Sequence, residues 1–276
     1  FDFKLFDFNS LFPSKNGIAK NTTYVDVFED DVFLVSGSGI FLKTPLQDIY
    51  SNKGNLSLIN SNISDFVNYD KFYGQSWYGI KDVFIDQGNI YVSFSNQLEE
   101  GCFNTSILVA KISEDELQFE MFFEDSECIE EDNEYGEFNA HQSGGRITDF
   151  KDNQLLFSIG EYRYRTKAQD KESLFGKIIS INKETKEAKV ISMGHRNVQG
   201  IKFIRDINII LSSEHGPYGG DEINIQRDID SIYNFGWPIS SYGEHYSTRN
   251  GFGQHSKGKK EEIIKVLENA PLNKNH

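Results

Sequence analysis

The chain has 276 residues, and its 42 acidic against 28 basic side chains give a net charge of −14 with the histidines neutral. Nucleic-acid-binding proteins need clustered Lys and Arg to contact phosphates, so this charge excludes that class. Aromatic residues make up 14% of the chain, which is enough apolar surface for a sizeable core, and no apolar run approaches the ~18 residues that a membrane helix needs.

Short runs of alternating apolar residues recur along the chain and end at Gly, Asn or Asp, which is typical of strands joined by turns. In chain order, four pairs of runs indicate hairpins at 32–35 with 40–43, 80–85 with 89–95, 146–150 with 154–159, and 199–203 with 207–213. Two further pairs, 106–112 with 118–123 and 177–182 with 188–193, extend the middle hairpins into units of four strands.

These units begin near Thr23, Ile80, Arg146 and Gln199, at intervals of 57, 66 and 53 residues. The spacing predicts an all-β fold, a β-propeller of four-stranded antiparallel blades. A β-sandwich is the rival fold, but it does not explain why four-strand units recur at this interval. We expect residues 1–276 to form a single propeller domain of about four blades with little helix; residues 261–268 could be a short helix or a strand.

The chain has two cysteines, Cys102 and Cys128. They fit either one disulfide in an oxidising compartment or two reduced, buried thiols, and the sequence leaves both open.

Polar and glycine residues cluster most densely from His141 onward. The segments are HQSGGR at 141–146, SIGE at 158–161, GHRNVQG at 194–200, SEHGP at 213–217, GDEIN at 220–224 and NFGWP at 234–238. In this order they resemble the soluble quinoprotein glucose/sorbosone dehydrogenase family, over residues 74–246. The resemblance implies a six-bladed propeller that holds PQQ and Ca²⁺ at one axial end and oxidises an aldose at C1 to a lactone.

The same resemblance assigns catalytic roles. His141 matches the catalytic base, and an imidazole suits this role because its unperturbed pKa lies near neutral pH. Glu161 stands where the family usually has Asp and would orient that imidazole. Arg196 and Asn197 match residues that contact the quinone, where a guanidinium can stabilise developing negative charge. His195 supports its loop rather than reacting.

Further positions match cofactor and metal ligands. His215 and Gly216 match cofactor-binding residues, and the carbonyls of Gly216 and Pro217 belong to the segment that holds Ca²⁺, for which carbonyl oxygens are suitable ligands. Glu222 aligns with a calcium ligand of some bacterial members, with the carbonyl of Phe235 as its companion. Gln75 stands in a segment that resembles the one bringing a Gln to the cofactor.

Several of these residues also have an ordinary structural interpretation: His141 as a loop histidine, Arg196 as a salt-bridged arginine, and Asp221 with Glu222 as a polar turn. Nothing after Tyr246 matches the Lys and paired arginines that clamp PQQ carboxylates in the family. We therefore expect the chain to cover about four of six blades and to be incomplete at its C-terminus.

The leading hypothesis is a PQQ- and Ca²⁺-dependent aldose dehydrogenase, located in the periplasm or secreted. The alternative is a propeller that has lost redox chemistry and serves as a binding or interaction module. A propeller hydrolase acting on a lactone is a third option. No motif identifies the electron acceptor.

Overall fold

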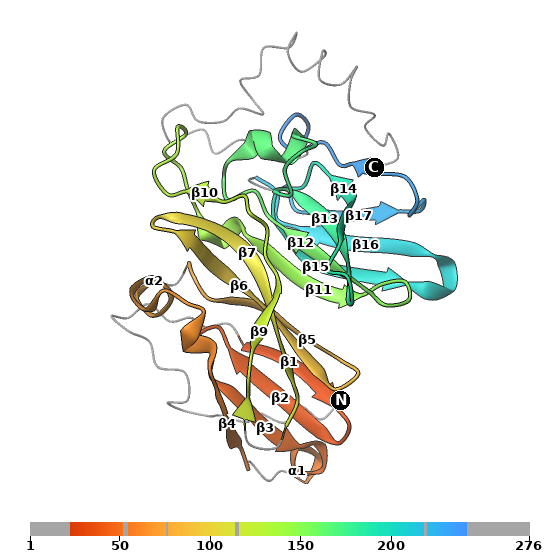
Figure 1. Ribbon diagram of the computed structural model, residues 1–276. Coiled ribbons are helices and arrows are strands. Elements are labelled where there is room, and N and C mark those ends of the chain that lie inside the picture. Colours follow the sequence, from red (N-terminus) through yellow and green to blue (C-terminus); the bar gives the residue numbers. More distant parts are fainter. Residues whose placement is uncertain (1–22, 52–54, 76, 114–115, 218–219, 242–276) are drawn as a thin grey trace. The chain divides into compact units, whose positions relative to one another are not determined.

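Figure 1 shows the computed structural model of the protein, which describes residues 23–51, 55–75, 77–113, 116–217 and 220–241. Within these residues the regular structure is almost entirely β. The helical elements are short: α1 (Leu46–Tyr50), α2 (Tyr69–Gly74), and the 3-10 turns η1 (Ile63–Asp65), η2 (Ala140–Gln142), η3 (Arg165–Gln169) and η4 (Arg205–Ile207). The expected low helix content is confirmed for the described residues. No helix among them is long and apolar enough to cross a membrane.

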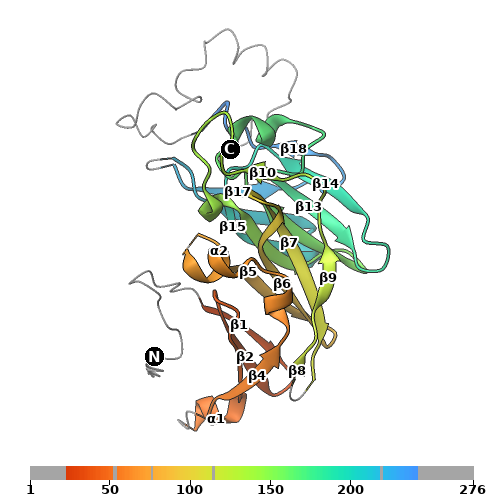
Figure 2. The same ribbon diagram turned by 60° about the vertical axis from the view of Figure 1, so that its left-hand side comes forward.

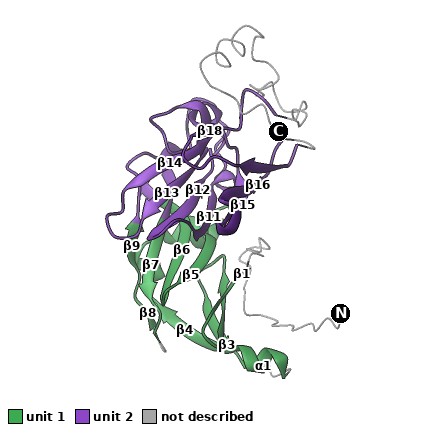
Figure 3. Cartoon of the chain, turned by 90° about the vertical axis from the view of Figure 1, so that its right-hand side faces the viewer, with its two compact units in different colours: residues 1–96, 107–122 green, residues 97–106, 123–276 purple. Residues whose placement is uncertain are grey.

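The chain divides into two compact units, coloured separately in Figure 3: residues 1–96 with 107–122, and residues 97–106 with 123–276. The first unit opens with an antiparallel sheet of β1 (Thr23–Phe28), β2 (Asp31–Ser36), β3 (Phe41–Pro45) and β4 (Ser57–Ser61). The short strand β8 (Glu116–Leu117) pairs in parallel with β4 at the edge of this sheet (Figure 2).

A second sheet is built on the predicted hairpin of β5 (Ile80–Asp86) and β6 (Asn89–Glu99). It continues through β7 (Cys102–Lys111), which pairs with β10 (Ile129–Glu130) and β9 (Glu120–Phe123). The core of the first unit includes Phe33 and Phe41 from the first sheet and Val92 from the second, all buried.

The second unit contains two sheets. One is β11 (Gly144–Asp149), β12 (Gln154–Ile159), β13 (Lys177–Asn182) and β14 (Ala188–Met193), all antiparallel, with β18 (Tyr233–Asn234) added in parallel to β14. The other is β15 (Val198–Ile204), β16 (Ile209–Glu214) and β17 (Glu222–Gln226). Leu155, Leu156 and Phe157 in β12 are all buried, so both faces of this strand are covered, which explains its continuous apolar run.

The predicted hairpins are confirmed, and each sheet begins at or within two residues of a predicted unit start: Thr23, Ile80, Gly144 and Val198. Some strand bounds were wrong: β7 begins at Cys102 rather than at 106, and the run predicted at 118–123 forms a strand only from Glu120. Ile207 belongs to η4, and β16 starts only at Ile209, because Asn208 takes a left-handed conformation between them. The stretch 261–268 lies outside the described residues.

Cys102 and Cys128 form a disulfide, which decides between the two alternatives that the sequence left open. Both residues lie in the second unit, where β10 pairs with β7 immediately beside the bridge: Ile129 with Phe103 and Glu130 with Cys102.

Candidate functional site

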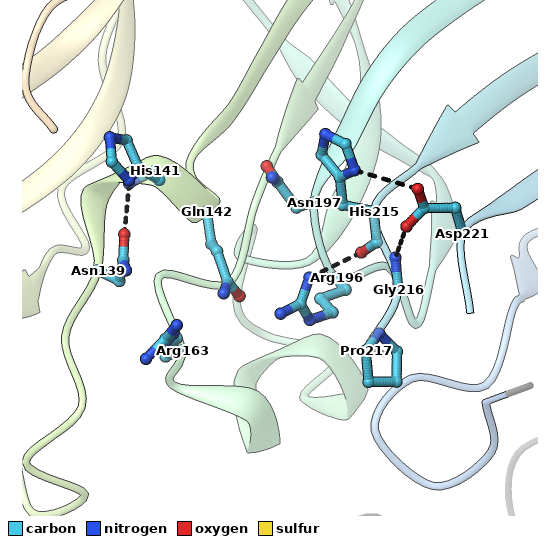
Figure 4. Close-up of a pocket in the computed structure, with 10 residues that line it drawn as sticks. All are labelled: Asn139, His141, Gln142, Arg163, Arg196, Asn197, His215, Gly216, Pro217 and Asp221. Atoms are coloured by element: carbon cyan, nitrogen blue, oxygen red, sulfur yellow. Dashed lines mark hydrogen bonds and ion pairs between the residues drawn. The ribbon is translucent and has the colours of Figure 1, made fainter. Parts of the chain in front are cut away.

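The second unit contains a cavity of about 730 Å³, drawn in Figure 4. It is lined by Asn139, His141, Gln142, Arg163, Arg196, Asn197, His215, Gly216, Pro217 and Asp221. These residues come from four loops that enter or leave two hairpins. Gly144 pairs with Ile159 and Val198 pairs with Glu214, so the four loops meet at the corresponding end of each hairpin.

The loop that carries His141 is held by close backbone packing. Asn139 caps η2, its Oδ1 accepting the His141 backbone N–H at 2.8 Å. A Cβ on Gly160 would lie 2.2 Å from the Gln142 carbonyl oxygen, and one on Gly144, whose φ is +64°, would lie 2.8 Å from the Gly160 nitrogen. Glycine is therefore required at both positions. The side chain of His141 is left exposed at the cavity.

A tight turn after β12 brings an arginine to the cavity. The Tyr164 N–H donates to the Glu161 carbonyl at 2.6 Å, and the two residues between them, Tyr162 and Arg163, have φ of +50° and +69°. Each such left-handed residue costs roughly 1–2 kcal/mol when it is not glycine. Tyr162 is fully buried and its hydroxyl lies 2.7 Å from Thr105 Oγ1, which offsets the cost at that position.

Glu161 is fully buried beside the cavity. With the Gln142 amide oriented to match its neighbours, its nitrogen donates to Glu161 Oε1 at 2.5 Å, while its oxygen accepts from Arg196 Nη2 at 2.9 Å and Arg163 Nε at 3.0 Å. Burial raises the pKa of Glu161 to about 7, and the positive charge of Arg196 opposes this rise.

The expected contact between Glu161 and His141 is not found among the described residues. Glu161 Oε1 bonds to Gln142, and Oε2 has no hydrogen-bond partner in the part of the chain that the structure describes. The carboxylate is fully buried while His141 is exposed to the cavity, so the two side chains occupy different environments. Gln142 links Glu161 to Arg196 and Arg163 by hydrogen bonds, and the charges of these arginines also act on Glu161 directly.

Arg196 is held by a buried network behind its loop. Its backbone N–H donates to Glu214 Oε2 at 2.7 Å, and Glu214 Oε1 lies 2.9 Å from His195 Nδ1. The other ring nitrogen of His195 lies 2.7 Å from Ser192 Oγ. His195 is completely buried, in agreement with the supporting role expected for it.

The Arg196 guanidinium extends from this support to the cavity. Its Nη1 donates to the His215 carbonyl at 2.9 Å (Figure 4), and its Cζ lies 5.4 Å from the centre of the Trp237 ring. The segment before Trp237 packs tightly on Gly194, where a Cβ would lie 2.2 Å from Asn234 Oδ1. The glycine at 194 thus lets the tryptophan loop approach Arg196.

Asn197, on the third loop, connects it to two others. Its Oδ1 accepts the Gly144 N–H of the first loop at 3.1 Å, and its carbonyl accepts the His215 N–H of the fourth loop at 3.1 Å. It is nearly buried.

The fourth loop contributes His215, Gly216, Pro217 and Asp221 to the cavity lining. The Gly216 N–H donates to Asp221 Oδ1 at 3.1 Å, the Pro217 carbonyl accepts the Gly220 N–H at 2.8 Å, and His215 Nδ1 lies 3.5 Å from Asp221 Oδ2. Both side chains of the His215–Asp221 pair are mostly exposed. Backbone carbonyls and a carboxylate are the oxygen ligands that calcium prefers.

The structure thus gathers six of the predicted site residues around one cavity: His141, Arg196, Asn197, His215, Gly216 and Pro217. Four others are not among the lining residues of this cavity within the second unit. Of these, Glu161 is buried, Glu222 lies on β17, and Phe235 is buried with its ring centre 5.0 Å from that of His195; Gln75 is an exposed residue of the first unit, so its prediction stays untested. Among the described residues, no group of three or more His, Cys, Asp or Glu side chains could hold a metal ion.

Four residues lining the cavity had no assigned site role: Asn139, Gln142, Arg163 and Asp221. Gln142 and Asp221 lie within motifs that the sequence analysis identified, so the motif residues beside them could have indicated that they line the cavity. Arg163 lies outside every motif, and an arginine in a left-handed turn has no sequence signature.

Comparison with known proteins gives a consistent result. The family model described as "Glucose / Sorbosone dehydrogenase" matches residues 49–267, a wider interval than the motifs marked. The chain is 29% identical over 180 residues to aldose sugar dehydrogenase YliI of Escherichia coli (strain K12), an alignment that covers 59% of this chain and 46% of that protein.

Two solved structures show the same fold. The apo-form of the soluble aldose sugar dehydrogenase from Escherichia coli has a TM-score of 0.61 at 22% identity, covering 82% of this chain and 65% of that one. The PQQ-bound aldose sugar dehydrogenase from Streptomyces coelicolor has a TM-score of 0.56 at 18% identity, covering 83% and 68%. The chain therefore spans about half the length of its curated relative and about two thirds of these structures.

Proposed function

The chain belongs to the glucose/sorbosone dehydrogenase family, and we propose that it is a quinoprotein oxidoreductase that uses PQQ and Ca²⁺ to oxidise the C1 hydroxyl of an aldose to a lactone. The observation that carries this proposal is the convergence of His141, Arg196, Asn197 and the 215–217 backbone on one cavity. Together these groups can accept a proton, stabilise a negative charge and bind a cation through oxygen atoms at one site, which is the set of tasks that the proposed reaction requires.

The residues present fit PQQ. The cofactor has three carboxylates and two quinone oxygens, so its site needs cationic and neutral hydrogen-bond donors in a cavity of a few hundred Å³. The cavity of about 730 Å³ offers the guanidiniums of Arg163 and Arg196 and the amides of Gln142 and Asn197. When bound, PQQ supplies the quinone that accepts a hydride from C1, and Ca²⁺ polarises it.

The protein's own part in the reaction is to move a proton and to stabilise charge. His141, exposed at the cavity, takes the proton of the C1 hydroxyl on a ring nitrogen, as a neutral imidazole can near neutral pH. With PQQ bound, Arg196 would stabilise the negative charge that develops on a quinone oxygen. Its backbone is fixed by Glu214 and its side chain by the His215 carbonyl, so little reorganisation is needed.

For calcium we propose the fourth loop, in which the carbonyls of Gly216 and Pro217 and the carboxylate of Asp221 are hard oxygen ligands at the same cavity. Glu222 and Phe235, the other expected ligands, are outside the cavity lining, so Asp221 replaces Glu222 in this proposal. Chelation of calcium should then lower the affinity for PQQ, and Asp221→Asn should weaken the response of the protein to added Ca²⁺.

The disulfide between Cys102 and Cys128 supports a location in an oxidising compartment, either the periplasm or outside the cell.

One observation favours the second candidate, a binding module without redox chemistry. Glu161 bonds to Gln142 through Oε1 and does not contact His141, so the pairing that the resemblance implied is not formed. Equilibrium titration with PQQ separates the two proposals, because a dehydrogenase must shift the quinone absorbance and a module without the cofactor leaves it unchanged.

The proposed activity is tested by reconstitution of the full encoded chain with PQQ and Ca²⁺ and by dye reduction with a panel of aldoses. His141→Gln should lower kcat about 10²- to 10⁴-fold, the usual contribution of a general base, while PQQ still binds. Absence of dye reduction with every aldose, despite bound PQQ, would remove the enzymatic proposal.

A further inference from the structure

We propose that Arg163 is a carboxylate-recognition residue of the cavity, an inference that rests on the proposed function and refines which molecules the site accepts. Arg163 lies outside the motifs that define the site and reaches the cavity through the tight turn after β12.

The backbone at Arg163 indicates that its side chain has a use. Two residues with positive φ at the centre of a tight turn normally call for Gly, Asn or Asp. At the first position Tyr162 is compensated by burial and by its hydroxyl contact with Thr105. Arg163 is only half-buried, and a left-handed backbone at a residue other than glycine is characteristic of functional positions.

The hydrogen bonds of the two arginines differ. Arg196 uses Nη1 on the His215 carbonyl and Nη2 on Gln142. Arg163 uses only Nε on Gln142, and its two terminal nitrogens have no hydrogen bond or ion pair with the residues that the structure describes. A guanidinium anchored at Nε on one side still presents further donors in its plane, a geometry that matches the two oxygens of a carboxylate.

The surroundings favour an anionic partner over a neutral sugar hydroxyl. Arg163 and Arg196 converge on the same Gln142 oxygen, so two positive charges lie close together at this wall of the cavity. Burial raises the pKa of the Glu161 carboxyl to about 7 against the opposing charges of Arg196, Arg165 and Arg163, and its Oε1 bonds to Gln142. The exposed acid of the lining, Asp221, is paired with His215 and with the Gly216 N–H.

Two molecules would bring a carboxylate to this place under the proposed function: PQQ itself, and an aldose that carries a carboxylate, such as a uronic acid. The chemistry recognised is the same in both cases. The experiment therefore measures PQQ affinity and the preference for an acidic aldose separately.

The test variant is Arg163→Gly, which removes the guanidinium and places at φ +69° the residue that tolerates it. Its matched control is Lys186→Gly, which removes a cation from an exposed residue at φ +63° in the turn between β13 and β14 of the same unit. Both variants should keep or raise the melting temperature, so a loss of binding would not reflect unfolding.

The first readout is the PQQ dissociation constant by absorbance titration. The second is the ratio of kcat/KM for glucuronate to that for glucose in the loaded enzyme. Loss of a charge-assisted pair predicts about a 10- to 100-fold change in one readout for Arg163→Gly, and none for Lys186→Gly. A change in PQQ affinity identifies the cofactor carboxylate, and a change in the ratio identifies the acidic aldose.

Two outcomes would overturn the proposal and are distinguishable. If the wild-type protein binds PQQ but Arg163→Gly matches it in both readouts, Arg163 recognises no carboxylate and the proposed function stands. If the wild-type protein shows neither a PQQ absorbance shift nor a melting-temperature shift with PQQ or glucuronate, the cavity binds neither molecule, and the proposed function and this refinement fail together.

Discussion

The burial of Glu161 makes the stability of the protein depend on pH in a defined direction. A carboxyl with a pKa raised from 4.5 to about 7 in the folded state holds its proton more tightly when folded than when unfolded. The folded state is therefore favoured most below pH 4.5, and this contribution is lost as the pH rises through 7. Glu161→Gln keeps a neutral side chain of similar size at every pH.

The size of the effect follows from the two pKa values. At 1.36 kcal/mol for each pH unit, a rise from 4.5 to about 7 corresponds to about 3 kcal/mol of unfolding free energy at pH 8. Because the side chain is fully buried, solvent does not screen this cost. We expect wild type to lose about 3 kcal/mol relative to Glu161→Gln between pH 4.5 and pH 8.

The assay is chemical denaturation of both proteins at intervals from pH 4.5 to 8, because the difference between them cancels the titration of all other groups. Glu172→Gln, which changes an exposed carboxyl of the same unit, is the matched control and should show no such trend. A difference that stays constant across this range, or in which wild type gains on the variant as the pH rises, would refute the reasoning.

Three further changes test the support of the site and the disulfide. Gly194→Ala should cost about 2–4 kcal/mol of unfolding free energy, because it combines φ of +73° with a backbone and side-chain clash, whereas Gly74→Ala, with nothing within 4 Å, should change little. Glu214→Gln should cost about 1–3 kcal/mol and weaken PQQ binding, since an NH₂ group would replace one of the two oxygens that accept hydrogen bonds in the buried network. Cys102→Ser with Cys128→Ser should cost about 3.5 kcal/mol, from the entropy of a loop with a sequence separation of 26.

Each of these three has a measurement that can contradict it. If the denaturation curves of Gly194→Ala and Gly74→Ala coincide, the loop that carries Trp237 can move away from residue 194 at no cost. A melting temperature of wild type that does not change with reductant, together with a mass shift showing reduction, would contradict the cost assigned to the disulfide. Unchanged PQQ affinity in Glu214→Gln would show that Arg196 does not need its buried support.

Most of the secondary structure could be predicted from the sequence. Successive side chains of a strand point to opposite faces, so a half-buried strand shows alternating apolar residues within a few positions. This alternation predicted all four hairpins and the approximate start of each sheet. The strand predicted from Ile207 begins only at Ile209, because η4 interrupts the alternation there. The short helix α2 was not anticipated, since five or six residues give too little periodicity for a helical pattern.

The motif residues at 141–146, 194–200 and 213–217 identified three of the four loops that build the cavity. Glycines there are recognisable because backbone contact leaves no space for a side chain, as at Gly160 and Gly194. Sequence alone therefore determined most of the strands, the order of the loops and most of the side chains that line the cavity.

Tertiary structure alone decided which side chains meet. The partner of Glu161 proved to be Gln142 and not His141, and Arg163 reached the cavity through a left-handed turn. Such contacts depend on burial and on distances between segments far apart along the chain. The pairing of Cys102 with Cys128 belongs to the same kind, since a bond between residues 26 positions apart forms only where the fold brings them together.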